Sequence, residues 1–460
     1  MADFINNKDI NRIHFIGIGG IGMSGIAEIL LNNGYAVSGS DLKPSHITNK
    51  LKEKGAKIYI GHSEKNVDNA DLVVYTSAVK SDNPEIHKAK QLGIPILDRA
   101  QMLGEIMKEY KRSLAIAGAH GKTTTTSMIS LIFEHANLNP TILIGGELKE
   151  INGNVKIGNK DYLITEACEY QENFLKFFPN VGVVLNIDED HLDYFENLEH
   201  IVNTFIKFAK LIPKQGYLII NNDDYNTRKL LSHANCNIIT YGINVESDFM
   251  AKNIIFNEKG YPSFEILYKN DTIGKISLKV LGYHNIYNAL AAISTTYTLG
   301  VPMDKIKEKL EDFTGTHRRF EIIGEKNNIK VIDDYAHHPT EIKATLEAAK
   351  KYPHNRIWCI FQPHTFTRTK ALLLDFASAF NNADNIIITD IYAAREKDTG
   401  EIHSKDLTNL IKKEGKNAVY IQNFEEIVEY LNENAKSKDI ILTMGAGNIY
   451  EVGNMYLKKD

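Results

Sequence analysis

The residues with the clearest chemical meaning lie in the stretch LAIAGAHGKTTTT, residues 114–126. A short apolar run leads into a turn bracketed by Gly118 and Gly121, and Lys122 and Thr123 then open an apolar helical pattern. In such a strand–turn–helix, N–H groups at the helix start and the Lys ammonium neutralise phosphate charge, while the Thr hydroxyl holds Mg²⁺. Gly118 stands four residues before Lys122, two fewer than in the common P-loop pattern. A surface Lys in a Gly-rich turn is the alternative, but four consecutive threonines suit a helix poorly unless their hydroxyls are needed.

A second Gly-rich stretch follows the apolar run 13–16 near the N-terminus. Gly17, Gly19 and Gly22 have the spacing of a dinucleotide fingerprint, and Asp41 lies where an acidic residue would meet a ribose hydroxyl. This pattern alone suggests NAD. The glycines indicate only that a pyrophosphate approaches a helix N-terminus, and a UDP-sugar also contains a pyrophosphate. A simple tight turn is the third interpretation.

Acidic and imidazole side chains follow two further apolar runs of the middle segment. Glu166 comes directly after one run, and His191 comes shortly after the next. The carboxyl ends of parallel strands meet at one sheet edge, so both side chains are candidate direct or water-mediated Mg²⁺ ligands beside Thr123. A solvated turn explains each cluster on its own, and the cluster at 221–224 is equally well explained either way.

The last third of the chain repeats this arrangement. Asp334, His337 and His338 follow one apolar run, and His364 and Arg368 follow the next. Isolated histidines are more often structural, but three of them after strands favour a ligand-binding edge of a further open α/β layer.

Two weaker pairs of polar residues are also candidates. Thr76 and Ser77 follow a predicted strand, where their hydroxyls would face a ligand, although a polar turn explains them equally well. Asn285 and Asn288 stand three apart in the first turn of a predicted helix, where their amides could read an adenine edge or simply cap the helix.

Apolar runs and helical patterns alternate along the chain, which predicts an α/β protein of several open sheets. We expect segment boundaries near residues 110 and 318, and a polar helix or linker at 101–111. The predicted strands are 13–16, 35–39, 57–60, 72–75, 94–97, 114–117, 162–165, 181–185, 217–220, hairpins within 254–281, and then four strands at 330–333, 356–361, 385–389 and 439–442.

The composition is that of an ordinary globular protein: 460 residues, 43% hydrophobic and 24% charged, with a net charge of −5. This length predicts about three domains. The charge gives no case for nucleic-acid or membrane binding, no apolar run could span a bilayer, and the N-terminus lacks a signal-peptide pattern. Cys168, Cys236 and Cys359 are far apart, which suits a reducing cytoplasm without a structural zinc site. We therefore expect a cytoplasmic enzyme.

Together these motifs resemble the ATP-dependent peptidoglycan-precursor ligases, the Mur ligases. Within the family, the chain is most similar to members that add L-alanine to UDP-N-acetylmuramate. The similarity covers almost the whole chain in family order. The stretches that carry it are HFIGIGGIGMSGIA (14–27), GSD (39–41), GAHGKTTT (118–125), EACE (166–169), NIDEDHLD (186–193), HNIYNA (284–289), HRRFE (317–321), DDYAHHPTE (333–341), QPHTFTRT (362–369) and GAGNI (445–449).

The resemblance implies three domains and one reaction. A Rossmann-like domain at 1–110 would bind the UDP-sugar, a P-loop ATPase domain with a mixed sheet at 111–318 would bind ATP and Mg²⁺, and a Rossmann-like domain at 319–460 would bind the amino acid. ATP would phosphorylate the lactyl carboxylate, and the L-alanine amine would attack the resulting acyl phosphate.

The resemblance also implies roles for individual residues. The implied ATP contacts are Gly118, Ala119, His120, Gly121, Lys122, Thr123, Thr124, Asn285 and Arg319. The implied Mg²⁺ ligands are Thr123, Glu166 and His191. The implied substrate contacts are Gly17, Gly19, Gly20, Gly22, Ser40, Asp41, Thr76, Ser77, His337 and His338. The implied catalytic residues are Lys122, His338, Arg319 and Arg368.

Some assignments stay open. Family members often have Arg where this chain has Thr365, so that Arg contact does not carry over. Lys207 is the nearest candidate for the carbamylated Lys of several sister ligases, and we do not assign it that role. One of Asp334, His337 and His338 would receive the amine proton. We expect a monomer or weak dimer; feedback regulation cannot be predicted.

Three other functions compete with this interpretation. A related ligase could add another amino acid or a ready-made peptide to the same sugar. A nicotinamide-dependent oxidoreductase fits the Gly-rich motif and Asp41 but leaves the phosphate loop, Glu166 and His191 unexplained. A non-catalytic nucleotide-binding regulator would have no need of the intact catalytic motifs.

Overall fold

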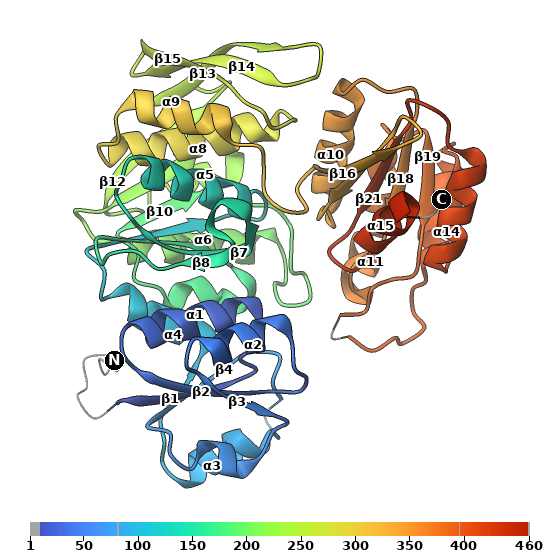
Figure 1. Ribbon diagram of the computed structural model, residues 1–460. Coiled ribbons are helices and arrows are strands. Elements are labelled where there is room, and N and C mark those ends of the chain that lie inside the picture. The colour runs from blue at the N-terminus through green and yellow to red at the C-terminus, as the bar shows by residue number, and fades with distance from the viewer. Residues whose placement is uncertain (1–9, 81, 395, 459–460) are drawn as a thin grey trace. The chain divides into compact units, whose positions relative to one another are not determined.

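The computed structural model describes residues 10–80, 82–394 and 396–458 (Figure 1). The N-terminal residues on which the signal-peptide expectation partly rests lie outside this range. The chain forms two compact units. The first comprises Met1–Ile187, Val202–Thr240 and Ala291–Val301, and the second comprises Asp188–Ile201, Tyr241–Leu290 and Pro302–Asp460.

The N-terminal part of the first unit is a five-stranded parallel sheet of order β3-β2-β1-β4-β5. The strands are β1 (Arg12–Ile16), β2 (Ala36–Asp41), β3 (Lys57–Ile60), β4 (Leu72–Tyr75) and β5 (Ile96–Asp98). The helices are α1 (Ile21–Asn32), α2 (His46–Glu53), η1 (Glu64–Val67), α3 (Pro84–Gln91) and α4 (Arg99–Met107). Four of the five β1 residues are buried in succession, as in a strand covered on both faces. The strand order reverses between β1 and β4, and in open α/β sheets ligands generally bind at such a switch point.

The first unit also contains the strands around the phosphate loop, in the order β12-β11-β10-β6-β9-β7-β8. The strands are β6 (Arg112–Ala117), β7 (Thr141–Leu148), β8 (Gly153–Lys156), β9 (Tyr162–Ala167), β10 (Val181–Val184), β11 (Tyr217–Asn221) and β12 (Asn237–Gly242). The helices are α5 (Lys122–His135), η2 (Lys149–Ile151), η3 (Tyr170–Lys176), α6 (Leu198–Leu211) and α7 (Tyr225–Arg228). The strands from β7 through β9, β6 and β10 to β11 are parallel, and β8 is antiparallel to β7, so the sheet is mixed.

Two hairpins in the second unit follow the end of β12, where Tyr241 pairs with Phe249. Their strands are antiparallel: β13 (Phe249–Phe256), β14 (Pro262–Tyr268) and β15 (Asp271–Ser277). Two helices come next, α8 (His284–Thr298) and α9 (Met303–Asp312). The expectation of hairpins within 254–281 is therefore confirmed.

The C-terminal sheet of the second unit has the order β16-β17-β21-β18-β19-β20, and only β16 is antiparallel. The strands are β16 (Glu321–Lys326), β17 (Ile329–Asp334), β18 (Ile357–Phe361), β19 (Asn385–Ile388), β20 (Ala418–Tyr420) and β21 (Ile440–Met444). The helices are α10 (Pro339–Lys351), α11 (Phe366–Ala371), α12 (Leu373–Ala377), η4 (Ser378–Phe380), α13 (Ser404–Lys413), α14 (Phe424–Asn434) and α15 (Tyr450–Lys458).

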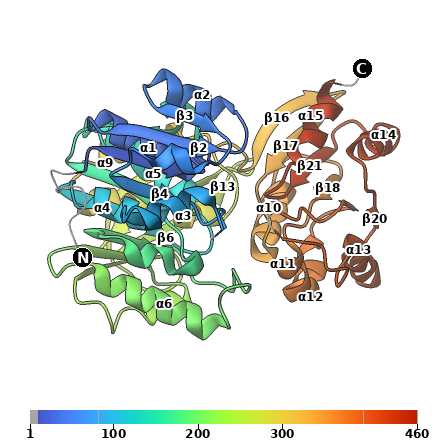
Figure 2. The same ribbon diagram turned by 90° about the horizontal axis from the view of Figure 1, so that it is seen from below.

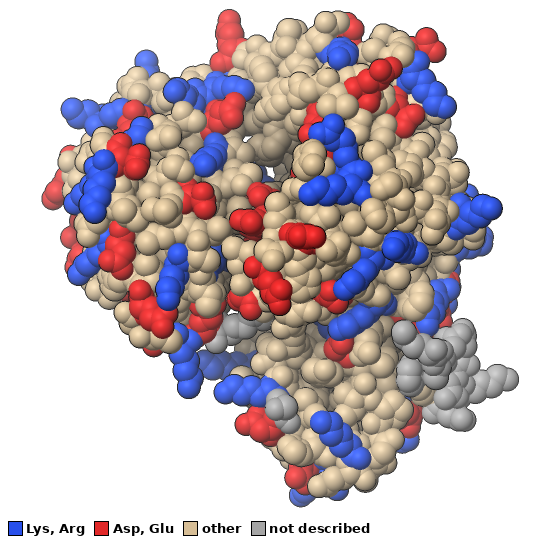
Figure 3. Space-filling model, turned by 180° about the vertical axis from the view of Figure 1, so that it is seen from behind, with Lys and Arg blue, Asp and Glu red and all other residues tan. Residues whose placement is uncertain are grey.

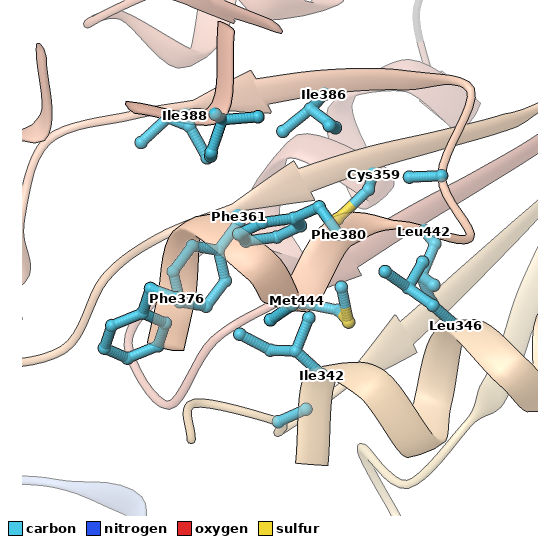
Figure 4. Close-up of a cluster of buried hydrophobic side chains, with 14 of the residues drawn as sticks. Ile342, Leu346, Cys359, Phe361, Phe376, Phe380, Ile386, Ile388, Leu442 and Met444 are labelled. Atoms are coloured by element: carbon cyan, nitrogen blue, oxygen red, sulfur yellow. The ribbon is translucent and has the colours of Figure 1, made fainter. Parts of the chain in front are cut away.

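Two hydrophobic clusters cover the faces of this sheet. One packs Phe361 and Leu442 against Ile342, Phe376 and other side chains of the α10, α12 and α13 layer (Figure 4). The other packs the opposite side of β18 and β21 against α14 and α15. Figure 2 shows these two groups of helices on either side of the strands. The sheet is thus a doubly wound, Rossmann-like layer.

The predicted α/β class and its three sheets are confirmed, with several corrections of detail. The strands β7, β8, β12, β16 and β20 were not predicted, so the C-terminal sheet has six strands rather than four. The segment expected to be a polar helix or linker at 101–111 is largely the helix α4, and most of it is buried because it packs against β4, β5 and α1 and against η3.

No helix in the described part of the chain is long and apolar enough to cross a membrane. On the face drawn in Figure 3, basic and acidic side chains are interspersed.

Candidate active site

The loop between β6 and α5 requires glycine at two positions. Gly118 has a φ of +141°, and a Cβ there would lie 3.0 Å from the Cβ of Leu185. Gly121 has a φ of +84° and is the residue directly before α5. Both conformations disfavour L side chains, so the shortened spacing of this loop is a defined turn rather than a loose connection.

The side chain of Asn186, just beyond β10, holds this loop in place. Its Oδ1 accepts a hydrogen bond from the His120 N–H at 2.8 Å, and its Nδ2 donates to the His120 carbonyl at 3.0 Å. The Asn186 carbonyl also accepts the N–H of Ala119 at 3.3 Å. Because β10 pairs directly with β6, this clamp fixes the loop to the neighbouring strand.

Lys122 lies back across the phosphate loop. Its Nζ donates to the carbonyls of Gly118 and Ala119, the latter at 3.1 Å, and lies 3.3 Å from the carboxylate of Glu169. Glu169 is only 2% exposed. An incoming polyphosphate would therefore compete with this buried carboxylate for the Lys122 ammonium.

Thr123 and Glu166 each lie beside one of two adjacent glycines of β7. The Gly145 N–H donates to Glu166 Oε1 at 2.7 Å, and a Cβ on Gly146 would lie 3.2 Å from Cγ2 of Thr123. Carboxylate and hydroxyl oxygens are the ligand types that Mg²⁺ prefers. The donor set in the first unit therefore fits this ion. The third predicted ligand, His191, belongs to the second unit.

The Gly-rich loop after β1 is bound to the end of β2. The N–H groups of Gly17 and Ile18 donate to the Ser40 carbonyl at 2.9 and 3.0 Å. The Gly19 N–H donates to Oδ2 of Asp41 at 2.8 Å, and a Cβ on Gly19 would lie 2.7 Å from that oxygen. The loop glycines, Ser40 and Asp41 therefore form one cluster at the expected sheet edge.

The remaining predicted contacts surround this loop. Gly20 is the residue before α1, and a Cβ on Gly22 would lie 3.2 Å from Cδ and Nη1 of Arg99. Thr76 packs against Gly17, the first glycine of the loop: a Cβ on Gly17 would lie 2.6 Å from Cγ2 of Thr76. Ser77 is exposed. Arg99 was not predicted, yet its basic side chain crosses the start of α1, where a pyrophosphate is expected.

In the second unit, Asp190 contacts the side chains of Arg368 and His191. Its Oδ1 accepts from Nη2 of Arg368 at 2.8 Å, and its Oδ2 lies 3.8 Å from Nε2 of His191. Burial alone would raise the pKa of Asp190, but the charges of His191 and Arg368 hold it well below its ordinary value. Arg368 is also 3.2 Å from Nδ1 of His364. Asp190, which was not predicted, therefore links His191 to Arg368.

The two adjacent histidines have different environments. Nε2 of His338 is 2.8 Å from the Glu189 carbonyl and must donate to it, while its Nδ1 accepts from the Thr340 N–H at 3.3 Å and caps α10. The Nδ1 of His337 donates to the Tyr335 carbonyl at 3.0 Å. Burial lowers the pKa of His337 to about 4, so its ring is neutral at neutral pH. Both ring nitrogens of His338 have protein partners, whereas Nε2 of His337 retains its lone pair.

Asp334 is buried, and backbone groups hold both of its oxygens. Oδ1 accepts the Ala336 N–H at 2.8 Å and Oδ2 accepts the Phe320 N–H at 2.7 Å. Burial raises the pKa of Asp334 to about 6 despite the nearby charge of Arg319. The guanidinium of Arg319 lies 3.8 Å from Glu341 and its side chain is 29% exposed, so it remains accessible.

Asn285 and Asn288 are buried and bonded to each other. Nδ2 of Asn288 donates to Oδ1 of Asn285 at 2.9 Å, and Nδ2 of Asn285 donates to the Leu281 carbonyl at 2.7 Å. These two hydrogen bonds tie the start of α8 to the segment before it.

Comparison with known proteins places these features in a family. The chain matches the models of three domains: "Mur ligase family, catalytic domain" at residues 12–111, "Mur ligase middle domain" at 116–296 and "Mur ligase, glutamate ligase domain" at 318–447. It is 60% identical over 455 residues to the UDP-N-acetylmuramate–L-alanine ligase of Acetivibrio thermocellus, covering 99% of this chain and 97% of that one. The chain belongs to the Mur ligase family.

Further relatives agree with this assignment. The UDP-N-acetylmuramate–L-alanine ligase of Alkaliphilus metalliredigens is 58% identical over 98% of both chains. The crystal structure of the UDP-N-acetylmuramate-alanine ligase of Thermotoga maritima superposes with a TM-score of 0.81 at 31% identity, covering 97% of this chain and 98% of that one. A murein peptide ligase from Psychrobacter arcticus follows with a TM-score of 0.71 and 26% identity over 97% of this chain. The fold of this Mur ligase is therefore the one that its motifs predicted.

Two residues of this Mur ligase bear on the open assignments. Lys207 is 56% exposed and forms an ion pair with Glu172 at 3.0 Å, so its ammonium already has a counter-charge. Thr365, which stands where the family often has Arg, has a φ of +67° directly before α11. A non-glycine residue in this region is strained, and such strain is concentrated at functional sites.

Arg318, the neighbour of the predicted Arg319, is a structural residue of this Mur ligase. Its Nε donates to Asp333 at 2.8 Å, and its Nη groups donate to the carbonyls of Gly447 at 3.0 Å and Gly445 at 2.8 Å. It therefore ties the chain before β16 to the Gly-rich turn after β21. The motif HRRFE could not show that its two arginines have different surroundings.

Proposed function

We propose that this Mur ligase joins L-alanine to the lactyl carboxylate of UDP-N-acetylmuramate at the expense of ATP, a step of peptidoglycan synthesis. The observation that carries the proposal is about 60% identity, over nearly the entire chain, to ligases of that name. ATP transfers its γ-phosphoryl group to the lactyl carboxylate and gives an acyl phosphate and ADP. The amine of L-alanine then attacks the acyl carbon, and inorganic phosphate leaves.

We assign the phosphoryl transfer to the loop between β6 and α5, within the ATP segment 111–318. Residues 118–124 bind the polyphosphate, Lys122 neutralises its charge, and Asn186 keeps the loop N–H groups aligned. Thr123 and Glu166, together with His191, would hold Mg²⁺, which supplies charge neutralisation at the phosphoryl oxygens. The catalytic contribution of these residues is positioning and electrostatic stabilisation. The adenine contact assigned to Asn285 would require its amide to exchange partners.

We assign the amino-acid segment to 319–460 and the second step to its strand ends. Arg319 and Arg368 stabilise phosphoryl and acyl oxygens. Of the three candidates for the amine proton, His337 is favoured, because its Nε2 lone pair remains while Asp334 and His338 are bonded on both polar atoms.

We assign the UDP-sugar to segment 1–110, with its pyrophosphate at the loop formed by Gly17, Gly19, Gly20 and Gly22. Ser40, Asp41, Thr76 and Ser77 surround that loop, and His337 and His338 are assigned to the sugar's reacting end. ATP and nucleotide-linked precursors are cytoplasmic metabolites, so we place the enzyme in the cytoplasm, acting as a monomer or weak dimer.

The test is ADP release by the purified chain with UDP-N-acetylmuramate, MgATP and a panel of acceptors. The panel contains L-alanine, glycine, L-serine, D-glutamate and a muramyl tripeptide. We expect release only with all substrates present and fastest with L-alanine. Fastest release with the tripeptide would identify a peptide ligase instead. A change in NADH absorbance with a 2-keto acid would favour an oxidoreductase.

A further inference from the structure

A buried polar cluster lies next to the Gly-rich loop and includes one charged residue with no assigned role. Glu85, on α3, is fully buried. Its Oε2 accepts from Ser40 Oγ at 2.7 Å and from His62 Nδ1 at 3.0 Å. Its Oε1 accepts from Asn66 Nδ2 at 2.5 Å and lies 3.8 Å from Nε2 of His14. We call these five residues the Glu85 cluster.

The Glu85 carboxylate is ionised in spite of its burial. Burial alone would raise its pKa, but the nearby imidazole of His14 and hydrogen bonds from Ser40 and Asn66 lower the pKa to about 2. A buried charge is costly, and replacing a whole buried polar cluster by apolar side chains of similar volume is often neutral or stabilising. Stability is therefore not a sufficient reason for a carboxylate and its four polar neighbours to occupy this position.

The cluster is connected to the ligand edge through two strand ends. Ser40 belongs to the end of β2, and its carbonyl accepts the N–H groups of Gly17 and Ile18. His62 follows β3, the strand paired with β2, and its side chain is 17% exposed. In Rossmann-like folds the end of the second strand meets the ribose of the nucleotide. Glu85 thus supports the nucleoside side of the predicted UDP-sugar site.

The orientation of Glu85 is itself fixed. The side chain of Asn83 caps α3 and accepts the Glu85 N–H at 2.9 Å, so the carboxylate projects from a capped first turn. The contact between Nδ1 of His62 and Glu85 favours the tautomer with its proton on Nδ1, in which Nε2 is an acceptor. Ring orientation and tautomer are both determined by the same carboxylate.

We propose that Glu85 is a positioning residue for the nucleotide half of the substrate, acting through Ser40 and His62. It fixes the Ser40 carbonyl that holds the Gly-rich loop, and it presents Nε2 of His62 as an acceptor for an N–H or hydroxyl of a uridine nucleotide. This inference rests on the proposed function, because it takes the loop after β1 to be the UDP-sugar site.

The test compares Glu85→Gln with Glu28→Gln. Glu28, on α1, is also buried (5% exposed) and paired with Lys50 and Lys54, but it has no contact with the loop. Calorimetric titration with UDP and with MgADP measures the two nucleotide sites separately. We expect Glu85→Gln to weaken UDP binding about tenfold, the effect of one or two lost charge-assisted hydrogen bonds, and to leave MgADP binding within about twofold. The KM for UDP-N-acetylmuramate should rise with little change in kcat, and Glu28→Gln should change neither constant.

The other possible results contradict either the proposed UDP-sugar site or the role given to Glu85. If the wild-type chain binds no UDP, the proposed site is wrong and this inference falls with it. If the wild type binds UDP and Glu85→Gln binds it equally well, the proposed function stands and this inference is overturned. An equal loss of UDP and MgADP binding, or the same loss in Glu28→Gln, shows a general effect on folding and also overturns it. If Glu85→Gln does not fold, His62→Ala keeps the carboxylate in place and removes the side chain through which it is proposed to act, and unchanged UDP affinity in that variant contradicts the proposal.

Discussion

The ammonium of Lys122 is the group that we expect to contribute most to phosphoryl transfer. Lys122→Ala removes the only lysine of the phosphate loop and leaves Glu169 as an unpaired buried carboxylate that repels polyphosphate. We predict that kcat for ADP release falls by about a hundredfold or more, since electrostatic groups at a phosphoryl transition state have effects of this size. Lys160→Ala, which breaks an ion pair with Glu109, is the control and should keep wild-type kcat. Full activity of Lys122→Ala would refute the assignment of the loop.

The neutral ring of His337 predicts a pH dependence of stability. Its pKa is about 4 in the folded chain and about 6.5 when unfolded, so between these values only the unfolded chain takes up the proton. Its contribution is complete above pH 6.5 and is lost as the pH falls towards 4. We predict a loss of about 3 kcal/mol over this range that His337→Asn does not show. Urea unfolding of both proteins at pH 7.5 and 4.5 measures it, and identical losses would contradict it.

Sequence spacing identified residue types but not their partners. The Gly-rich loops, Glu166, His191 and the two histidines after β17 were recognised because each follows an apolar run. The ion pairs Lys122–Glu169 and Asp190–Arg368 were not predicted, because their members are 47 and 178 residues apart in the sequence. Only folding decides which strand ends become neighbours.

The hydrogen bonds from Asn186, just beyond β10, to the phosphate loop between β6 and α5 give a prediction about ATP binding. Asn186→Ala removes both side-chain hydrogen bonds to His120 but leaves β6, β10 and α5 in place. We predict that the KM for ATP rises about tenfold, because loop N–H groups that are no longer aligned bind phosphate less well. Asn180→Ala is the matched control, since Asn180 accepts the Ser113 N–H at the opposite end of β6, at 2.8 Å. A similar KM for ATP in both variants would show that the clamp does not act on the loop.

The elements that sequence analysis missed share physical features. β8 has the sequence GNVK, with one apolar side chain among four residues, and β20 has three residues of which one is buried, so neither stands out as a buried apolar run. β7 contains two adjacent glycines, which are depleted in strands, and these glycines are what lie beside Glu166 and Thr123. β16 is an edge strand, antiparallel to its neighbour, with charged residues at both ends. Buried parallel strands such as β10 were predicted because continuous burial requires a continuous apolar run.

At the level of the whole chain, one prediction concerns the autonomy of the C-terminal sheet. All six strands of this sheet lie within 321–444, and the buried residues of its two hydrophobic clusters lie within 329–456. Of the partly buried residues packed against them, Leu192 alone lies outside the segment 316–460. A layer with cores on both faces meets the requirements for independent folding. We therefore predict that a fragment of residues 316–460 folds cooperatively without the first unit.

Arg318 decides where this fragment must begin. A fragment of residues 319–460 has the same strands and clusters but lacks the hydrogen bonds from Arg318 to Asp333, Gly445 and Gly447. We predict that its free energy of unfolding is lower by about 3 kcal/mol, because these bonds involve a charged donor and a buried carboxylate. Trp358, the sole tryptophan of the chain, is 3% exposed in β18, so its fluorescence in urea reports the unfolding of this sheet directly. Equal midpoints would show that Arg318 contributes nothing to the layer, and the absence of a cooperative transition in both fragments would show that the sheet depends on the rest of the chain.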